Sequence, residues 1–463
     1  MSEDSLGGRF ADINISPPGP NSRRLSAQLH TYESRNITYV SDEFPIFLSD
    51  AHGANIVDVD GNVYVDLTGA FGVAAAGHSN PQVVEAMAAQ ARRLFHGMGD
   101  VYPTENRLAL AKLLCGLTPG EGAKRVIFAA TGAEAVEAAL KTAAIASGKP
   151  GVICFTDAYH GLSYGTLPLT DRDEFKAPLR AQLAPFAVRA PYPNAHRCPL
   201  SHCRGDCDAA CLAAVRALLD GPKGADIGAV IVEAVAGRGG VVPAPAGWLQ
   251  GLREMCDERS LVLIVDEIFT GFGRTGRWFA CERAGIVPDL LCLGKGMSSG
   301  FPIAACVGKA EIMDRWPLSG GEAMHTGTFL GHPAGCAAAL ASIAELRKHR
   351  LAERAAELEG SVRSLLQGVA ACSDGRISDI RGCGLLWGLE CTAPDGGPDA
   401  KLAAEVMREA MINGVLILTC GPHRNVISLS PPLTISLEQL RFCARVLEST
   451  FANAVAAPAV VVR

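Results

Sequence analysis

The chain has 463 residues, a length that predicts more than one packed unit. Hydrophobic residues make up 48% of it and charged residues 19%, which is typical of a globular protein and argues against intrinsic disorder. The formal net charge is −6 and no long basic run occurs, so the composition disfavours nucleic acid and anionic lipid as partners.

No apolar stretch reaches the ~20 residues that a membrane helix needs. The acidic start, Met1-Ser2-Glu3-Asp4, is not followed by an apolar segment, which disfavours a secretory signal. The sixteen cysteines are therefore expected as thiols rather than as a disulfide framework. These features together predict a cytoplasmic protein.

The N-terminal residues 1–45 contain several prolines and show little periodicity, which predicts an extended arm. A β-hairpin is expected at Ile56–Leu67, with its turn at Asp60-Gly61.

Between about 80 and 335, short apolar runs alternate with helical patterns. The expected helices are Ala133–Ala146, Ala209–Leu219 and Trp248–Arg259. The seven expected strands are Arg125–Ala130, Val152–Phe155, Phe186–Ala190, Ala229–Glu233, Val262–Asp266, Leu290–Leu293 and Ala304–Gly308. This alternation predicts an α/β domain whose mostly parallel seven-stranded sheet is covered by helices on both faces.

After residue 335 the pattern changes to long helices and a few strands, which predicts a smaller α+β domain. The expected elements are helices at Ala334–His349, Leu351–Val369, Ala400–Asn413 and Leu437–Ala452, with a strand region at Gly382–Glu390. We expect three parts: residues 1–75 as an arm and hairpin that join the small domain, residues 76–335 as the large domain, and residues 336–463 as the small domain.

The segment Thr131-Gly132-Ala133-Glu134 leads from a strand into a helix. Gly132 and Ala133 leave room for an anion next to the free N–H groups and the positive dipole end of the new helix. This pattern suits a phosphate, and an ordinary strand-to-helix turn is the alternative.

Two further residues follow the ends of strands. Tyr159, just before His160-Gly161, can stack on a flat ring or serve as a core aromatic. Asp266 ends an apolar strand, where a carboxylate needs a cationic partner such as a protonated ring nitrogen, unless it caps a helix. The next residue, Glu267, is expected to pair with Arg274.

Lys295 lies between Gly294 and Gly296 after the next strand. Desolvation lowers the pKa of such an amine, which then attacks carbonyls and forms a Schiff base, whereas a surface turn is the commoner place for a Gly-Lys-Gly. Thr328, in a glycine-rich loop, can bind a phosphate oxygen or cap the helix that follows. The phosphate site, the aromatic ring, the carboxylate and the lysine are together the parts that pyridoxal 5′-phosphate (PLP) requires.

From about residue 45 to about residue 450 the sequence resembles the class III aminotransferases, which have the fold-type I architecture. The most specific matches are Val265-Asp266-Glu267-Ile268, Arg274-Thr275-Gly276, Pro288-Asp289 and Gly294-Lys295-Gly296. The resemblance implies that Lys295 forms the Schiff base with PLP and that Asp266 binds the pyridine nitrogen. It further implies ring contacts from Tyr159 and Ile268, phosphate contacts from Gly132 and Ala133, an acidic site residue at Glu233, and a homodimer in which Thr328 reaches the phosphate of the neighbouring subunit.

The sequence departs from the family pattern at three places. Ala234-Val235-Ala236 replaces the family's Pro-x-Gln, and Phe269 replaces a glutamine. Ser428 stands where many amino-acid-specific members have an arginine that clamps the substrate α-carboxylate. Arg424 is a candidate substitute for that cation, and loops around Phe71 and Tyr102 are expected to contribute further substrate contacts.

These departures predict an aminotransferase that moves an amino group between an amino-acid donor and a carbonyl substrate without an α-carboxylate. The resemblance suggests a 6′-oxo aminoglycoside intermediate of antibiotic biosynthesis as that substrate. The alternatives are an ω-amino acid or 4-aminobutyrate type of aminotransferase, and an epimerase or racemase on the same fold.

Four cysteines cluster at Cys198, Cys203, Cys207 and Cys211, with His196 and His202 nearby. Their spacing lacks the paired C-x₂-C pattern of metal sites, and the last two are expected to begin a helix. We therefore expect buried free thiols here rather than a bound metal.

Overall fold

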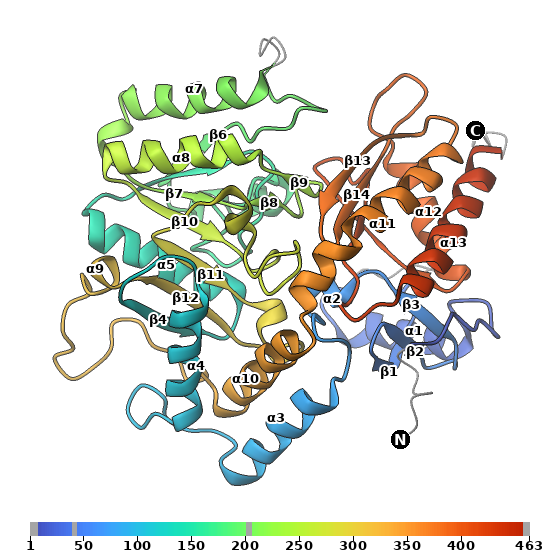
Figure 1. Cartoon of the computed structure of the whole chain (residues 1–463), viewed down its shortest axis with the longest axis horizontal. Coiled ribbons are helices and arrows are strands. Elements are labelled where there is room, and N and C mark those ends of the chain that lie inside the picture. The colour runs from blue at the N-terminus through green and yellow to red at the C-terminus, as the bar shows by residue number, and fades with distance from the viewer. Residues whose placement is uncertain (1–7, 39–43, 201–205, 457–463) are drawn as a thin grey trace.

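The computed structural model describes residues 8–38, 44–200 and 206–456. Seven strands, in the order β4-β12-β11-β10-β7-β5-β6, form one central sheet (Figure 1). The strands are β4 (Lys124–Ala129), β5 (Gly151–Phe155), β6 (Ala187–Ala190), β7 (Ile227–Val232), β10 (Val262–Asp266), β11 (Leu290–Leu293) and β12 (Ala304–Lys309). The predicted sheet is confirmed: β12 is antiparallel to both of its neighbours, and the remaining pairs are parallel.

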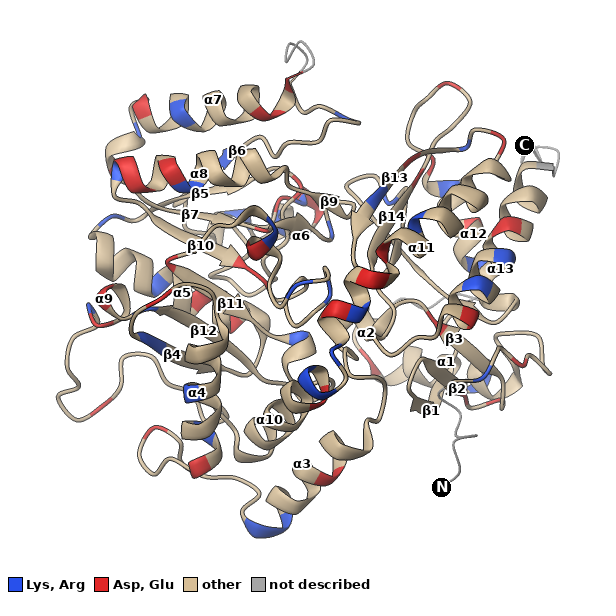
Figure 2. Ribbon diagram, viewed as in Figure 1, with Lys and Arg blue, Asp and Glu red and all other residues tan. Residues whose placement is uncertain are grey.

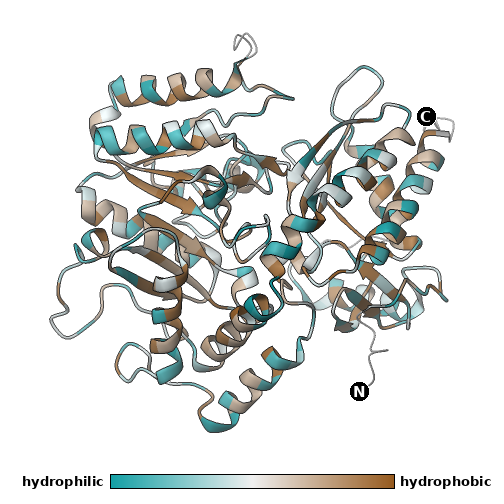
Figure 3. Cartoon of the chain, in the orientation of Figure 1, coloured by the Kyte–Doolittle hydropathy of each residue, from teal (hydrophilic) through white to brown (hydrophobic). Residues whose placement is uncertain are grey.

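Side chains of this sheet alternate between two apolar clusters because successive residues of a strand point to opposite faces. In β10, Leu263 and Val265 belong to one cluster, and Val262 and Ile264 to the other. The first cluster is covered by α4 (Glu105–Leu117), α7 (Cys207–Asp220) and α8 (Ala246–Arg259), and the second by α5 (Gly132–Ser147). Figure 3 shows the brown, apolar strands between these helices, and Figure 2 shows charges of both signs on α7 and α8.

The C-terminal part contains a second, antiparallel sheet in the order β13-β14-β17-β16. Its strands are β13 (Ile377–Cys383), β14 (Leu386–Cys391), β16 (Leu418–Cys420) and β17 (Val426–Leu429). The accompanying helices are α10 (Pro333–Lys348), α11 (Leu351–Ala371), α12 (Ala400–Ile412) and α13 (Leu437–Ala456). The predicted helices of this region are confirmed, and the predicted strand region divides into β13 and β14.

The N-terminal strands β1 (Leu48–His52), β2 (Asn55–Asp58) and β3 (Val63–Asp66) form a third sheet. The predicted hairpin is confirmed as β2 and β3. β3 also pairs in parallel with β15 (Val415–Leu416), so N-terminal and C-terminal segments share one sheet. The predicted domain limits at residues 75 and 335 stay predictions.

The prediction of a purely extended N-terminal arm is wrong, because residues Pro20–Tyr32 form helix α1. Pro20 suits the first turn of a helix, where its missing N–H is not needed. The carboxylate of Asp60 accepts the backbone N–H groups of Asn21 and Ser22 at 2.8 and 2.9 Å. A tertiary contact with the hairpin turn thus stabilises the start of a helix that the sequence of residues 1–45 did not predict.

The remaining elements are short or lie at the periphery, and none of the helices in the described ranges is long and apolar enough to cross a membrane. They are α2 (Gly69–Gly72), α3 (Pro81–Arg93), α6 (Asp173–Lys176), α9 (Ala310–Met313), β8 (Val235–Ala236), β9 (Val242–Pro243) and the 3₁₀ helices Ala177–Gln182, Gly224–Asp226, Ala280–Ala284 and Lys295–Met297.

Candidate active site

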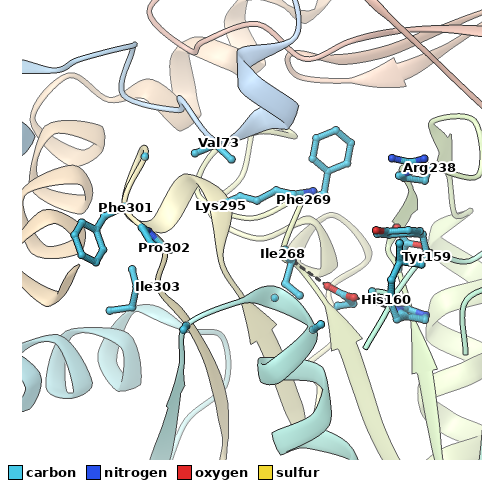
Figure 4. A pocket seen from close by; sticks show the side chains of 18 residues that line it. Val73, Tyr159, His160, Arg238, Ile268, Phe269, Lys295, Phe301, Pro302 and Ile303 are labelled. Carbon is cyan, nitrogen blue, oxygen red and sulfur yellow. Dashed lines mark hydrogen bonds and ion pairs between the residues drawn. The ribbon is translucent and has the colours of Figure 1, made fainter. Parts of the chain in front are cut away.

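A cavity of about 390 Å³ opens where the parallel strands of the central sheet end (Figure 4). This is the edge at which open α/β sheets bind ligands, and the volume falls in the range of small-molecule sites. Seven of the eight candidate residues line it: Gly132, Ala133, Tyr159, Glu233, Asp266, Ile268 and Lys295. Other lining residues, which the sequence did not single out as cavity residues, include Val73, His160, Arg238, Phe301, Pro302 and Ile303.

Lys295 extends into this cavity from the loop after β11, and its amine lies 4.1 Å from the centroid of the Phe269 ring. Its backbone φ is +43°, a left-handed conformation that is uncommon for a residue with a side chain. Burial lowers the pKa of the Lys295 amine from 10.5 to about 8, and nearby Asp266 and Glu233 oppose that shift. The lysine is therefore a cavity residue whose amine loses its proton more readily than an ordinary lysine, rather than the lysine of a surface turn.

Asp266 lies at the end of β10 and has a partner for each carboxylate oxygen. One oxygen accepts the backbone N–H of Ile268 at 3.0 Å, and the other is 2.8 Å from Nδ1 of His160. The His160 ring is buried, and its Nε2 has no hydrogen-bond partner within the described residues. Asp266 thus combines the turn-capping role with a charge that faces the cavity, and His160 holds that carboxylate in place.

The N-terminus of α5 borders the cavity through Gly132 and Ala133. The Thr131 side chain accepts the N–H of Glu134, whose carboxylate in turn accepts the N–H groups of Ala130 and Thr131. The N–H groups of Gly132 and Ala133 have no partner inside the helix, because they belong to its first turn. A Cβ at Gly132 would lie 3.0 Å from the Ile268 side chain, so glycine keeps this entrance open.

Tyr159 and Glu233 also line the cavity. The Glu233 carboxylate accepts the backbone N–H of Tyr159 at 3.0 Å and that of Gly237 at 3.1 Å. Burial raises the pKa of Glu233. The guanidinium of Arg238 lies over the Tyr159 ring, 4.9 Å from its centroid, as Figure 4 shows. Glu233 therefore fixes the two backbone segments that carry Tyr159 and Arg238.

Phe269, which replaces the family's glutamine, is wedged between two glycines. A Cβ at Gly72 would lie 2.5 Å from its ring, and a Cβ at Gly237 would lie 2.4 Å from it. Val235 and Val241 belong to the apolar cluster against which the ring packs. The ring closes one side of the cavity beside the Lys295 amine and presents no hydrogen-bonding group to it.

The expected pairing of Glu267 with Arg274 is wrong. Glu267 does not pair with Arg274: its carboxylate is bound by the Thr270 hydroxyl and by the backbone N–H of Cys281. Arg274 is buried and donates instead to two backbone carbonyls of the C-terminal part, those of Leu385 and Pro431. The arginine therefore connects the two parts of the molecule.

The loop around Phe71 reaches the cavity through Val73, as expected, whereas Arg424 and Tyr102 do not line it. Arg424 is exposed and pairs with Glu174 at 2.9 Å, so it is no substitute for the family's arginine within the cavity. Phe71 and Tyr102 are exposed and do not line the cavity. Thr328 is also exposed and outside the lining, and the N-cap of α10 is His332 rather than Thr328.

The cysteine cluster contains two neighbouring thiols at the start of α7, as expected. The sulfur atoms of Cys207 and Cys211 are 3.9 Å apart, and both residues are buried. Among the described residues, no group of three or more His, Cys, Asp or Glu side chains is arranged to hold a metal ion. His202 and Cys203 lie outside the described residues.

The chain is similar in sequence and in fold to known aminotransferases. The family model "Aminotransferase class-III" matches residues 37–451. A 4-aminobutyrate aminotransferase from Mycobacterium leprae is 39% identical over 91% of this chain and 94% of its own length. A diaminobutyrate–2-oxoglutarate aminotransferase from Rhizobium meliloti is 36% identical over 88% of each chain. The PLP-bound structure of an amine transaminase from an uncultivated Pseudomonas species has a TM-score of 0.82 at 28% identity, covering 91% of this chain and 99% of that one.

The residues of the cavity also fit PLP. The free N–H groups at the start of α5 suit a phosphate, the Asp266 carboxylate suits a ring nitrogen, and the amine of Lys295 suits an aldehyde. On the extent of the family match, the identity to the curated relatives and the PLP-dependent neighbours, this chain belongs to the class III aminotransferases, enzymes of fold type I that depend on PLP.

Proposed function

We propose that this aminotransferase exchanges an amino group between an amino-acid donor and a carbonyl substrate that has no α-carboxylate. The proposal rests on Ser428, because the resemblance implies a carboxylate-clamping arginine at this position. Ser428 lies in β17 and does not line the cavity. Without that arginine, the α-carboxylate of a second substrate lacks the clamp that the resemblance implies at this position. The apolar side chains of Val73, Phe269 and Phe301 in the lining are consistent with a less polar substrate.

When bound, PLP supplies an electron-withdrawing ring that carries the amino group between the two substrates. Lys295 is proposed to bind it covalently and then to move a proton to and from the substrate carbon through Nζ. Asp266 is proposed to hold the proton on the ring nitrogen, with His160 fixing the carboxylate. Tyr159 and Ile268 are proposed to hold the ring from its two sides, while the N–H groups of Gly132 and Ala133 bind the phosphate; Glu233 is proposed to hold the Tyr159 backbone.

Two substrate classes follow for the carbonyl side. An oxo-aminoglycoside such as a 6′-oxo intermediate of antibiotic biosynthesis follows from the sequence resemblance. An ω-amino acid is the second candidate, and the relatives named 4-aminobutyrate aminotransferase favour it. In both classes the amine carbon carries no α-carboxylate, as the proposal requires.

A homodimer with shared sites is also part of the proposal. Exposed apolar side chains occur on residues 94–102 and 324–329, two segments that are joined by a hydrogen bond from Thr326 to Asp100 at 2.6 Å. They are Leu94, Phe95, Met98, Val101, Tyr102, Met324 and Phe329. A second copy of the chain would cover these side chains and bring Thr328 to the phosphate of the neighbouring site. We also propose a cytoplasmic location, in keeping with buried free thiols such as those of Cys207 and Cys211.

The test is a single-turnover reaction of the PLP-loaded enzyme with a panel of amines, followed by the absorbance of the bound cofactor. The panel contains L-alanine, L-glutamate, 4-aminobutyrate and a 6′-amino aminoglycoside. We expect fast conversion by one amino-acid donor and by at least one of the last two amines. Conversion by α-amino acids alone would contradict the proposal. Sedimentation as a monomer at micromolar concentration would contradict the shared sites.

A further inference from the structure

Arg238 carries a positive charge in the cavity that no protein group neutralises. Among the described residues, its side chain makes no ion pair and no hydrogen bond, and its buried Nε has no partner. Among the described residues, the guanidinium of Arg238 contacts the face of the Tyr159 ring. Arg238 is the arginine of the cavity lining and Lys295 is its lysine.

The position of this side chain is fixed by its backbone. The Arg238 carbonyl accepts the N–H of Gly421 at 3.0 Å, and Arg172 donates to the same carbonyl at 3.4 Å and to the Gly421 carbonyl at 2.7 Å. One residue earlier, the N–H of Gly237 is bound by Glu233. The loop is thus held on both sides of residue 238, and the guanidinium projects onto Tyr159 at the cavity wall (Figure 4).

Neither of the two carboxylates in the cavity lining pairs with Arg238. The positive charge of Arg238 contributes to the lowered pKa of Lys295, after the larger effect of burial. The two carboxylates in the lining are already engaged, Glu233 by backbone N–H groups and Asp266 by His160 and Ile268. An incoming carboxylate would therefore meet a guanidinium whose planar donors are free to bind it in a bidentate pair.

We propose that Arg238 binds the carboxylate of the amino-acid donor and of the 2-oxo acid formed from it. This assignment rests on the proposed function, in which one substrate carries a carboxylate next to the amine carbon and the other does not. When the substrate has no carboxylate, the guanidinium lies against the Tyr159 ring, where a cation–π contact stabilises it without an anion. Arg238 is then the residue that lets one cavity accept both substrates.

The experiment uses the PLP-loaded enzyme and three variants: Arg238→Gln, Arg238→Lys and, as a matched surface arginine, Arg424→Gln. Two measurements are made on each. The first is the binding of glutarate, which has two carboxylates and no reacting group, followed by the absorbance of the bound cofactor. The second is the single-turnover conversion by L-glutamate and by 1-phenylethylamine, an amine without a carboxylate.

We expect Arg238→Gln to weaken glutarate binding and the apparent affinity for L-glutamate at least about tenfold, because hydrogen bonds to charged groups are lost. The affinity for 1-phenylethylamine should change less than about threefold. Arg238→Lys keeps the charge but not the planar donors, and should fall between the parent and Arg238→Gln. Arg424→Gln should match the parent in both measurements.

Three results would overturn the inference. Equal losses with both amines would make the role of Arg238 structural, and an effect of Arg424→Gln equal to that of Arg238→Gln would move the carboxylate site to the surface. A loss of PLP affinity in Arg238→Gln, with glutarate binding kept, would assign Arg238 to the cofactor phosphate. If the parent enzyme converts neither amine, the proposed function itself is wrong, and the glutarate titration still decides whether Arg238 binds carboxylates.

Discussion

The lowered pKa of Lys295 predicts an unusual stability profile for the cofactor-free enzyme. In the unfolded chain this amine titrates near 10.5, whereas in the fold it titrates at about 8. Between these two pH values the unfolded state binds more protons than the folded state, so the free energy of unfolding rises with pH. The difference between the two pKa values corresponds to at most about 3 kcal/mol, which the folded protein regains as the pH rises from below 8 to above 10.5.

Lys295→Met removes the charge and keeps a side chain of similar length. Below pH 8 the parent protein carries the full penalty of a charged amine in the cavity, so we expect the cofactor-free variant to be more stable by about 1–3 kcal/mol at pH 7. The advantage should shrink steadily above pH 8, because the parent amine then becomes neutral. Urea unfolding of both proteins at several pH values between 6.5 and 10 measures this difference directly.

The pH dependence of the difference is the decisive quantity, since all other titrating groups are common to both proteins. A stability difference that stays constant from pH 6.5 to 10 would refute the reasoning, because it would mean that the Lys295 amine titrates near its ordinary pKa. A variant less stable than the parent at pH 7 would refute it as well. The same folding measurement on an exposed lysine variant, Lys401→Met, serves as the matched control.

Three further predictions concern single contacts. Asp266→Asn keeps the shape but removes the negative charge that faces the cavity, and should lower kcat about 100-fold or more with little change in the unfolding curve; an unchanged kcat would contradict the role of the charge. Gly72→Ala places a methyl group against the Phe269 ring and should lower the free energy of unfolding by about 1–3 kcal/mol, and by clearly less when Phe269→Ala is already present; equal losses in both backgrounds would contradict the clash. Arg274→Leu leaves two carbonyls of the C-terminal part without their donor, so urea unfolding should show a loss of about 2–4 kcal/mol, and a loss under 1 kcal/mol would mean that these contacts contribute little.

The central sheet could be predicted from the sequence because its strands are buried on both faces and therefore appear as nearly continuous apolar runs. The cavity could be predicted for the same reason. Residues at or just after the ends of such strands, including Asp266 and Lys295, must meet at one edge of the sheet. Helix α1 could not be found in this way, because its first turn is stabilised by Asp60, about forty residues away in the chain.

Long-range partners account for the remaining differences. Glu267 and Arg274 are close in sequence and opposite in charge, yet each finds its partners elsewhere, and Arg274 finds them more than a hundred residues later. His160 follows Tyr159 directly, so its position was visible but its contact with Asp266 was not. Arg238 adjoins the segment that departs from the family pattern, and that departure is the signal that could have drawn attention to it.

The Phe269 side chain, packed between Gly72 and Gly237, limits the size of the cavity on one side. Because neither glycine position tolerates a methyl group while the ring is present, these three sites cannot vary independently. Shortening the side chain at position 269 would add the space that the ring now fills to the cavity and admit bulkier amines beside Lys295. An engineer who wishes to widen the range of acceptors should therefore begin at position 269, with both glycines left untouched.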